Sequence, residues 1–217
     1  MPRNRWILVL AAGWLLWACS PVARGASAAQ HTVDVWNTDQ GDLPHSVVLA
    51  MIQTRDGYLW LGTPKGLARF DGVRFERFNE SNTPGLGSGV VVKLFEDSRD
   101  NLWVGTKSGI VLVTPQGKLT PVDVGRGGEL RAACQDAAGA VWLYTADGQL
   151  ARCLDKRFEV WNVGGGLPSR CRALIAEDAG PLWVGTDTSL AGIGQVSGEA
   201  VRALPVAFEV PVARLDF

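Results

Sequence analysis

The chain has few of the residues on which enzyme mechanisms depend. Only two histidines, His31 and His45, occur among its 217 residues, and neither lies in a metal-binding or helical pattern. The sequence shows no glycine-rich nucleotide loop before a helix and no nucleophile spaced with a base. We therefore expect no catalysis, no cofactor and no metal within this span, and we interpret both histidines as solvated.

An excess of basic residues is also lacking. Lysine and arginine together number 21 against 22 aspartates and glutamates, which gives a net charge of −1. A protein that binds the phosphate backbone of DNA or RNA normally carries a clear positive excess. We expect no nucleic-acid partner.

Cysteine is scarce and has no metal-binding spacing. Beyond the N-terminal region the chain contains Cys134, Cys153 and Cys171, an odd number without a C-x-x-C pair. Neither a zinc site nor a disulfide framework is indicated, so we expect small, buried apolar residues. A Cys153 to Cys171 bridge stays open as an alternative in an oxidising compartment.

Long hydrophobic runs are absent as well. The longest uncharged apolar stretch near the N-terminus, Trp6–Trp17, is shorter than the ~20 residues that cross a bilayer as a helix. Arg3 and Arg5 precede it, and Ala26-Ser27-Ala28 supplies an A-x-A cleavage site. This order predicts a signal peptide over residues 1–28 and export to the periplasm or another extracytoplasmic space.

Cys19 leaves a second form of processing open. Leu16-Trp17-Ala18-Cys19 resembles the lipobox of bacterial lipoproteins, although Trp17 stands where that motif has a small or aliphatic residue. Cleavage there would lipidate Cys19 and attach the chain to a membrane. Cleavage after Ala28 would instead make Cys19 part of the apolar leader.

The remaining sequence is repetitive. Asp56–Thr63, with its core Leu-Trp-Leu-Gly-Thr, recurs as Asp100–Thr106, weakly as Gly139–Thr145, and again as Gly180–Thr186. The four tryptophans at the centres of these units lie 43, 39 and 41 residues apart: Trp60, Trp103, Trp142 and Trp183. A period of ~40 residues is typical of propeller blades and exceeds that of leucine-rich repeats.

Each unit holds four short runs with strand character, rich in β-branched and aromatic residues and separated by turn residues such as Asp56-Gly57. The tryptophan run is apolar at consecutive positions, so both faces of its sheet should be covered. Face-to-face packing of four-stranded blades meets that demand. We therefore predict an all-β fold, a β-propeller over residues 29–217.

The same pattern assigns structural roles to the repeated positions. The tryptophans should be buried where blades meet, and the glycines two residues after them should allow neighbouring backbones to approach closely. These glycines are Gly62, Gly105 and Gly185. Four units and the start of a fifth at Val212–Phe217 are present, which predicts an incomplete ring and a fragment of a longer protein.

These units resemble the two-component regulator propeller repeat, whose core is D-G-x-[LI]-W-[LVI]-G-T followed by G-[LI]-x-R-[FYL]. Asp56–Phe70 matches it nearly throughout, and Asp97–Thr106 matches its second recurrent form. Trp36–Val48, with Gly41-Asp42-Leu43-Pro44, is similar to the segment that opens such sensors, with one inserted residue, and Gly166-Leu167-Pro168 repeats that loop.

The resemblance implies the sensor region of a histidine-kinase-like or diguanylate-cyclase signalling protein whose output domain and membrane helix are missing here. It also implies an extracytoplasmic ligand, carbohydrate being one candidate, and a homodimer. Two other functions stay open, a stand-alone secreted or lipidated interaction module and a propeller-type lyase or glycosidase.

A few side chains allow a functional and a structural interpretation. Asp56 and Asp100 could supply calcium ligands, but aspartate before a hairpin more often accepts backbone hydrogen bonds. Arg69 and Arg152 recur at one blade position, where packing of the stem is favoured over ligand contact. By position alone, ligand-binding loops would be Leu43-Pro44, Leu86-Gly87-Ser88 and Leu167-Pro168-Ser169.

Overall fold

The computed structural model describes residues 35–36, 38, 43–86, 89–124, 128–162, 171–177, 182–186, 190–197 and 200–204. The chain divides into two compact units, Met1–Val35 and Trp36–Phe217, and every described strand belongs to the second. Several expectations lie outside the described residues: the signal peptide 1–28 with Cys19, His31, the loop at Leu167 and the fifth unit at Val212–Phe217.

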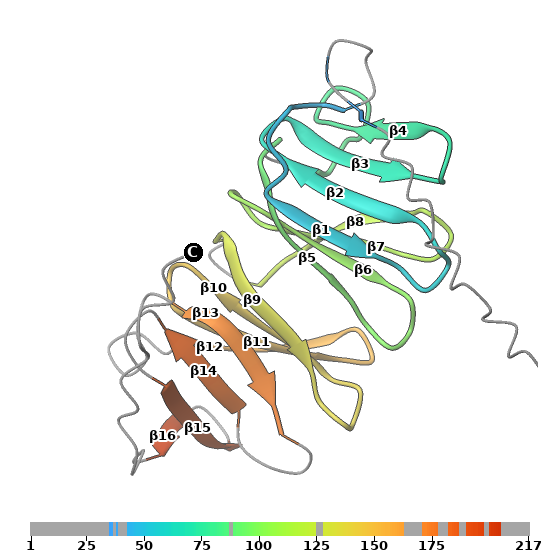
Figure 1. Cartoon of the computed structure of the whole chain (residues 1–217). Helices are drawn as coiled ribbons and strands as arrows, with labels where there is room; N and C mark the ends of the chain where they lie inside the picture. The colour runs from blue at the N-terminus through green and yellow to red at the C-terminus, as the bar shows by residue number, and fades with distance from the viewer. Residues whose placement is uncertain are drawn as a thin grey trace, which may run out of the picture. The chain divides into compact units, whose positions relative to one another are not determined.

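The described residues form sixteen strands in four antiparallel sheets, and each sheet follows chain order (Figure 1). The first sheet contains β1 (Ala50–Gln53), β2 (Leu59–Thr63), β3 (Gly66–Phe70) and β4 (Phe75–Phe78). The second contains β5 (Val91–Glu96), β6 (Leu102–Thr106), β7 (Ile110–Val113) and β8 (Leu119–Val122).

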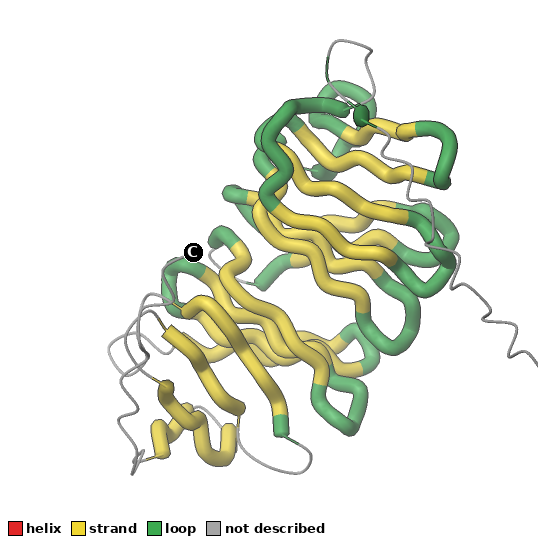
Figure 2. Tube along the Cα trace, viewed as in Figure 1, coloured by secondary structure: helices red, strands yellow, loops and turns green. Residues whose placement is uncertain are grey.

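The third sheet contains β9 (Leu130–Gln135), β10 (Val141–Thr145), β11 (Gln149–Leu154) and β12 (Arg157–Asn162). The fourth contains β13 (Cys171–Ala176), β14 (Leu182–Thr186), β15 (Leu190–Ser197) and β16 (Ala200–Leu204). Figure 2 shows only strands and loops in the described chain, and none of its residues belongs to a helix long and apolar enough to span a bilayer.

Tight turns explain why consecutive strands pair. In the first sheet the turn before β2 contains Gly57 at φ 93°, a conformation that costs glycine little and other residues more. The Gly57 N–H donates to the carbonyl of Thr54 at 2.8 Å and closes the hairpin. The resulting register places Trp60 between Ile52 on β1 and Arg69 on β3.

The core lies between sheets. The first strands of the sheets contact one another in order, β1 with β5, β5 with β9 and β9 with β13. Each main cluster draws on two successive sheets: Trp60 packs with Val91 and Val104, Trp103 with Leu130 and Leu143, and Trp142 with Leu174 and Val184. The predicted all-β fold of four-stranded propeller blades is therefore confirmed, and the four sheets are called blades 1 to 4 below.

Two glycines lie where successive blades approach most closely. A Cβ on Gly62 would lie 2.7 Å from Val91 Cγ1 in blade 2, and a Cβ on Gly105 would lie 2.6 Å from the Leu130 Cβ in blade 3. At Gly185 the nearest atom is the Cβ of Ala173 at 3.5 Å, an ordinary contact within the same blade. Blade 3 carries the fully buried Tyr144 at this position.

Candidate functional site

In three blades an acidic residue six positions before the tryptophan accepts a hydrogen bond from the indole nitrogen. Asp97 accepts the Nε1–H of Trp103 at 2.9 Å, Asp136 that of Trp142 at 2.8 Å, and Glu177 that of Trp183 at 3.2 Å. A buried indole N–H needs an acceptor, and a carboxylate supplies a strong one. We did not predict this pairing from the sequence, although three of the four units contain the spacing D/E-x5-W.

Both oxygens of the Asp97 carboxylate accept further hydrogen bonds from the same turn. Its Oδ1 accepts the backbone N–H of Arg99 at 2.9 Å and that of Asn101 at 3.0 Å, while the Asn101 amide nitrogen donates to both oxygens. The side chain is buried. It is therefore a turn-forming residue rather than a group free to bind a ligand.

The first blade has Thr54 at this position. The two candidate calcium ligands follow the first strands of blades 1 and 2. Asp56 accepts the Thr54 hydroxyl at 2.6 Å and the Tyr58 N–H at 3.3 Å, whereas Asp100 pairs with Arg55 at 2.6 Å. Within the described ranges, no group of three or more His, Cys, Asp or Glu side chains could hold a metal ion. The contacts of Asp56 agree with the turn interpretation, whereas the Asp100 side chain engages the Arg55 guanidinium of blade 1.

A second polar contact recurs between blades. The backbone N–H of Arg55 in blade 1 donates to Glu96 Oε1 at 3.0 Å in blade 2. In the same way, the N–H of Ser98 in blade 2 donates to Gln135 Oε1 at 2.8 Å in blade 3, and the Gln135 Nε2 returns a bond to the Ser98 hydroxyl at 2.9 Å. Both acceptors lie seven residues before a tryptophan, at the end of the first strand.

The third interface differs at this position. Blade 4 carries Ala176 seven residues before Trp183, and alanine has no side-chain acceptor. We call the contacts of Glu96 with Arg55 and of Gln135 with Ser98 the inter-blade latch. The side chain of Ala176 cannot make the corresponding contact between blades 3 and 4. Its partner position in blade 3 is Ala137.

The recurrent arginines lie across the blade from the tryptophans. Arg69 is paired in register with Trp60 and Glu76, and Arg152 with Trp142 and Glu159. The Arg69 guanidinium lies 4.4 Å from the Tyr58 ring centroid and forms an ion pair with Glu76. These contacts agree with the prediction that the arginine stem packs on the blade. The guanidinium lies over an aromatic ring.

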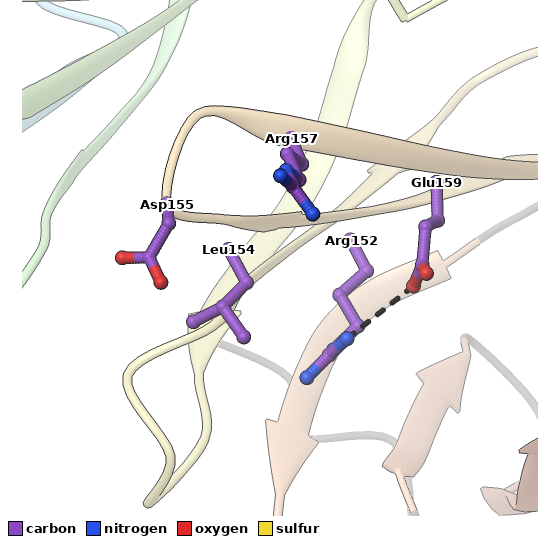
Figure 3. A pocket seen from close by; sticks show the side chains of 5 residues that line it. All are labelled: Arg152, Leu154, Asp155, Arg157 and Glu159. Carbon is purple, nitrogen blue, oxygen red and sulfur yellow. Dashed lines mark hydrogen bonds and ion pairs between the residues drawn. The ribbon is translucent and has the colours of Figure 1, made fainter.

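Arg152 lines a surface cavity of about 530 Å³ together with Leu154, Asp155, Arg157 and Glu159. Figure 3 shows its guanidinium directed at Glu159, 3.3 Å away, and it also lies 5.7 Å from the Trp142 ring centroid. Asp155 is engaged by Arg99 of blade 2 at 2.5 Å. Most charges in the cavity are therefore already paired within the protein.

The three cysteines are free and buried, so the disulfide alternative is wrong in this structure. Cys153 lies in the core cluster of blades 2 and 3, whereas Cys171 lies with Cys134 in the cluster of blades 3 and 4. Burial raises the pKa of Cys134 to about 12 and that of Cys171 to about 11. Burial also raises the pKa of Cys153, so all three favour the neutral thiol.

The three loops that position alone suggested as ligand-binding loops are described only in part. Leu86 is fully buried in the core of blades 1 and 2, so it anchors its loop instead of presenting a side chain to a ligand. Leu43 and Pro44 are half-buried. His45 accepts the N–H of Val47 through Nδ1 at 3.0 Å, which makes it part of a turn. Gly87, Ser88 and Leu167–Ser169 lie outside the described residues.

Two stretches of the chain, residues 42–65 and 85–108, match the family model of the two component regulator propeller. Each of these two stretches is similar to the two-component regulator propeller repeat. The matched stretches contain β1 and β2 of blade 1 and β5 and β6 of blade 2. They therefore include both tryptophan strands that the sequence matched to the repeat.

Solved structures with the same fold include extracellular domains of two component systems. The extracellular domains of two candidate hybrid two component systems from B. thetaiotaomicron, BT4673 and BT3049, align with TM-scores of 0.60 and 0.61 at 20% and 16% identity. Each alignment covers 75% of this chain but only 23% and 25% of the relative. This chain thus spans about a quarter of their length.

A lyase shares the fold too. A virginiamycin B lyase from Staphylococcus aureus aligns with a TM-score of 0.57 at 10% identity, over 74% of this chain and 56% of the lyase. At such identities the likeness shows the propeller fold alone. No curated protein matched the chain by sequence.

Proposed function

We propose that this chain is the input propeller of a two-component, hybrid-histidine-kinase-like sensor whose output domain lies outside the 217 residues. The observation that carries the proposal is the match of residues 42–65 and 85–108 to the two component regulator propeller. The extracellular domains of BT4673 and BT3049, which share the fold, support it. The role of the propeller would be to bind a ligand and relay its presence.

The proposal includes an extracytoplasmic location. Residues 1–28 are the signal peptide and residues 29–217 the exported propeller, with lipidation at Cys19 as the alternative form of processing. The support comes from the order of Arg3, Arg5, the apolar stretch and the A-x-A site. The fold relatives from B. thetaiotaomicron are extracellular domains, which agrees with that location.

Within this span we propose binding without catalysis. The described thiols have raised pKa values and are buried, which disfavours the thiolate that a cysteine nucleophile requires. His45 is engaged in a turn. The partner would be an extracytoplasmic ligand, with carbohydrate suggested by the family resemblance, and the assembly a homodimer. Nucleic acid does not fit the balanced charge.

The decisive experiment reads the gene beyond the codon for Phe217. Further propeller repeats, a membrane-spanning helix and a kinase or cyclase output are expected. A stop codon directly after Phe217 would contradict the sensor proposal and favour the stand-alone secreted module.

Location is tested separately by fusing alkaline phosphatase to Phe217 and measuring its activity in intact bacteria. We expect an active enzyme and, by mass spectrometry, a mature N-terminus after Ala28. A lipidated Cys19 would establish the alternative processing. An intact Met1 with an inactive phosphatase would refute export.

A further inference from the structure

The outermost strand of each blade, β4, β8, β12 or β16, has one free edge, because it is bonded to a single neighbour in its own sheet. A free edge presents unpaired backbone N–H and C=O groups and can pair with a strand of another chain. Natural proteins block such edges with proline, with side chains or with loops. The edges of β4, β8 and β12 differ in whether they are blocked in this way.

The edges of β4 and β8 are blocked. On β4 the carbonyl of Arg77 accepts the side-chain Nδ2–H of Asn82 at 2.8 Å, so a side chain already occupies this position of the edge. The strand β8 contains Pro121, which has no N–H to donate. Since the Thr114 N–H donates to the Lys118 carbonyl at 3.0 Å and bonded pairs alternate along an antiparallel ladder, the Pro121 nitrogen lies on the free edge. A further strand cannot bond regularly to either edge.

The free edge of β12 is set by the turn that precedes the strand. Asp155 at φ 50° and Lys156 at φ 64° are the two central residues of a tight turn of type I′. Such a turn makes its flanking residues, Leu154 and Arg157, a hydrogen-bonded pair of the ladder between β11 and β12. Arg157 and every second residue after it therefore bond to β11, whereas the residues between them direct their N–H and C=O groups to the free edge.

Phe158 and Val160 are two of these edge residues, and their outward backbone groups are unblocked. Among the residues that the structure describes, none bonds to these groups. The strand contains no proline over its six residues. Its edge side chains are accessible as well, since Phe158 is 37% and Val160 41% exposed. An open edge of this length with apolar side chains is a site for pairing with another strand.

The sequence of β12 can pair with a second copy of itself in one favourable register. About a two-fold axis at Val160, antiparallel strands place Val160 opposite its own copy and Glu159 opposite Trp161. β-branched side chains pack well against their neighbours across strands. An axis at Glu159 would set two like charges opposite one another, which destabilises a pair of strands. An axis at Phe158 would shorten the pairing, since only Arg157 separates that residue from the preceding turn.

We propose that two copies of this chain pair through β12, antiparallel and centred on Val160, so that their third blades join into one continuous sheet. The pairing gives the outward backbone groups of each copy partners in the other copy. It deepens the proposed function by naming the surface of the homodimer, and it rests on that function only for a role in signalling. One pair of strands buries less than the ~1,600 Å² of a standard interface, so the dimer is weak and forms at high protein concentration.

The first test measures disulfide cross-linking in the 217-residue chain. Val160→Cys places two thiols opposite one another at a backbone separation of about 5.5 Å, which a disulfide can span. The matched control is Val73→Cys, at a valine that is 79% exposed in a turn of blade 1. Both variants carry Leu49→Ser/Met51→Ser, which removes exposed apolar side chains beside β1. The same background without a new cysteine gives the rate of cross-linking through the native thiols.

At equal concentration and with a mild oxidant, we expect Val160→Cys to form a covalent dimer at least about tenfold faster than Val73→Cys, because pairing raises the effective concentration of the two thiols. Val73 is the more exposed residue, so random collision alone would favour the control. Equal rates, or faster dimer formation by the control, would overturn the pairing.

The second test measures self-association without a cross-link, in the same background. In Val160→Lys two positive charges lie opposite one another in the paired strands, which should raise the dissociation constant of the dimer at least about tenfold. Val73→Lys adds the same charge to blade 1 and should leave the dissociation constant unchanged. Sedimentation velocity at about 100 μM protein, a concentration suited to a weak interface, measures both variants.

The two tests separate this pairing from the proposed sensor. A background protein that stays monomeric at this concentration would overturn the pairing and leave the edge of β12 to a strand of another protein. A dimer that forms equally well in Val160→Lys would overturn the pairing but keep the homodimer, at another surface. Neither result bears on the sensor, which the gene sequence beyond Phe217 decides.

Discussion

The indole nitrogen of a buried tryptophan needs an acceptor, and in this chain a carboxylate from the preceding turn supplies it. Asp97, Asp136 and Glu177 each bond the tryptophan six residues later. In blades 2 and 3 one side chain thereby fixes both the hairpin and the orientation of the ring that packs on the next blade. An unsatisfied buried N–H costs about 1–3 kcal/mol, so this contact matters to stability.

Asp97→Ala should lower the free energy of unfolding by about 2–3 kcal/mol, because it leaves the Trp103 Nε1–H and two backbone N–H groups without their acceptor. Asp56→Ala is the control, since Asp56 is exposed and accepts from one hydroxyl and one N–H. We expect it to cost less than about 1 kcal/mol. Urea denaturation followed by tryptophan fluorescence measures both, and equal losses would contradict the role of Asp97.

Alkaline pH should destabilise the fold through the buried cysteines. Burial raises the pKa of Cys134 to about 12 and of Cys171 to about 11, from the ordinary 9.0. Above pH 9 the unfolded chain loses these protons while the folded chain keeps them, so stability falls as the pH rises from 9 toward 11. Thermal unfolding from pH 7 to 11 should show a smaller decline in Cys134→Ala/Cys171→Ala than in wild type, relative to each protein at pH 7. An equal decline would mean that these thiols do not contribute.

Close approach of blades depends on the glycine two residues after the tryptophan. In Gly105→Ala the new Cβ would lie 2.6 Å from the Leu130 Cβ, so blade 3 would have to shift. We expect a loss of about 1–3 kcal/mol. Gly109→Ala, at a position with no atom within 4 Å of the new Cβ, should change stability by less than about 0.5 kcal/mol. Thermal denaturation of both variants tests the difference, and two neutral variants would show that the interface relaxes freely.

Loss of one contact of the inter-blade latch should lower the protection of amide hydrogens only near that contact. Gln135→Ala removes the acceptor of the Ser98 N–H and a donor to the Ser98 hydroxyl, with a cost of about 1 kcal/mol. Hydrogen exchange at Ser98 should therefore accelerate. Gln53→Ala provides the control, because Gln53 bonds the Gly57 carbonyl within its own blade. Faster exchange at Ser98 in the control variant would show a global effect instead of a latch.

On the scale of the molecule, the first blade exposes apolar side chains beside β1. Val47, Val48 and Leu49 are exposed, and Met51 is 66% exposed. The strand β1 begins at Ala50, so Val47, Val48 and Leu49 precede it. Contiguous exposed apolar area next to a free strand edge favours association between chains.

We therefore predict that residues 29–217 associate in solution. Leu49→Ser/Met51→Ser should reduce the mass measured by light scattering toward that of the monomer. Val73→Ser is the control, because Val73 is 79% exposed but isolated in the turn after β3, and it should leave association unchanged. A monodisperse wild-type monomer with strong amide protection in all four blades would contradict the prediction.

The sequence by itself determined the blades. The period of about 40 residues, the consecutive apolar residues at each tryptophan and the turn residues between runs fix four antiparallel strands per unit, because these signals are local and repeated. The structure has four strands in each of the four units, as that pattern predicts. The repeat match at residues 42–65 and 85–108 rests on the same local pattern.

Only the tertiary structure decided which polar groups meet across blades. Arg55 and Glu96, or Ser98 and Gln135, are about 40 residues apart, and neither pair has a spacing rule that sequence reading could apply. Likewise, the separation of Cys153 from Cys171 depends on how whole sheets stack. Local pattern specifies a strand, whereas contacts between strands of different blades are set by packing, since side chains distant in sequence meet only once the core has formed.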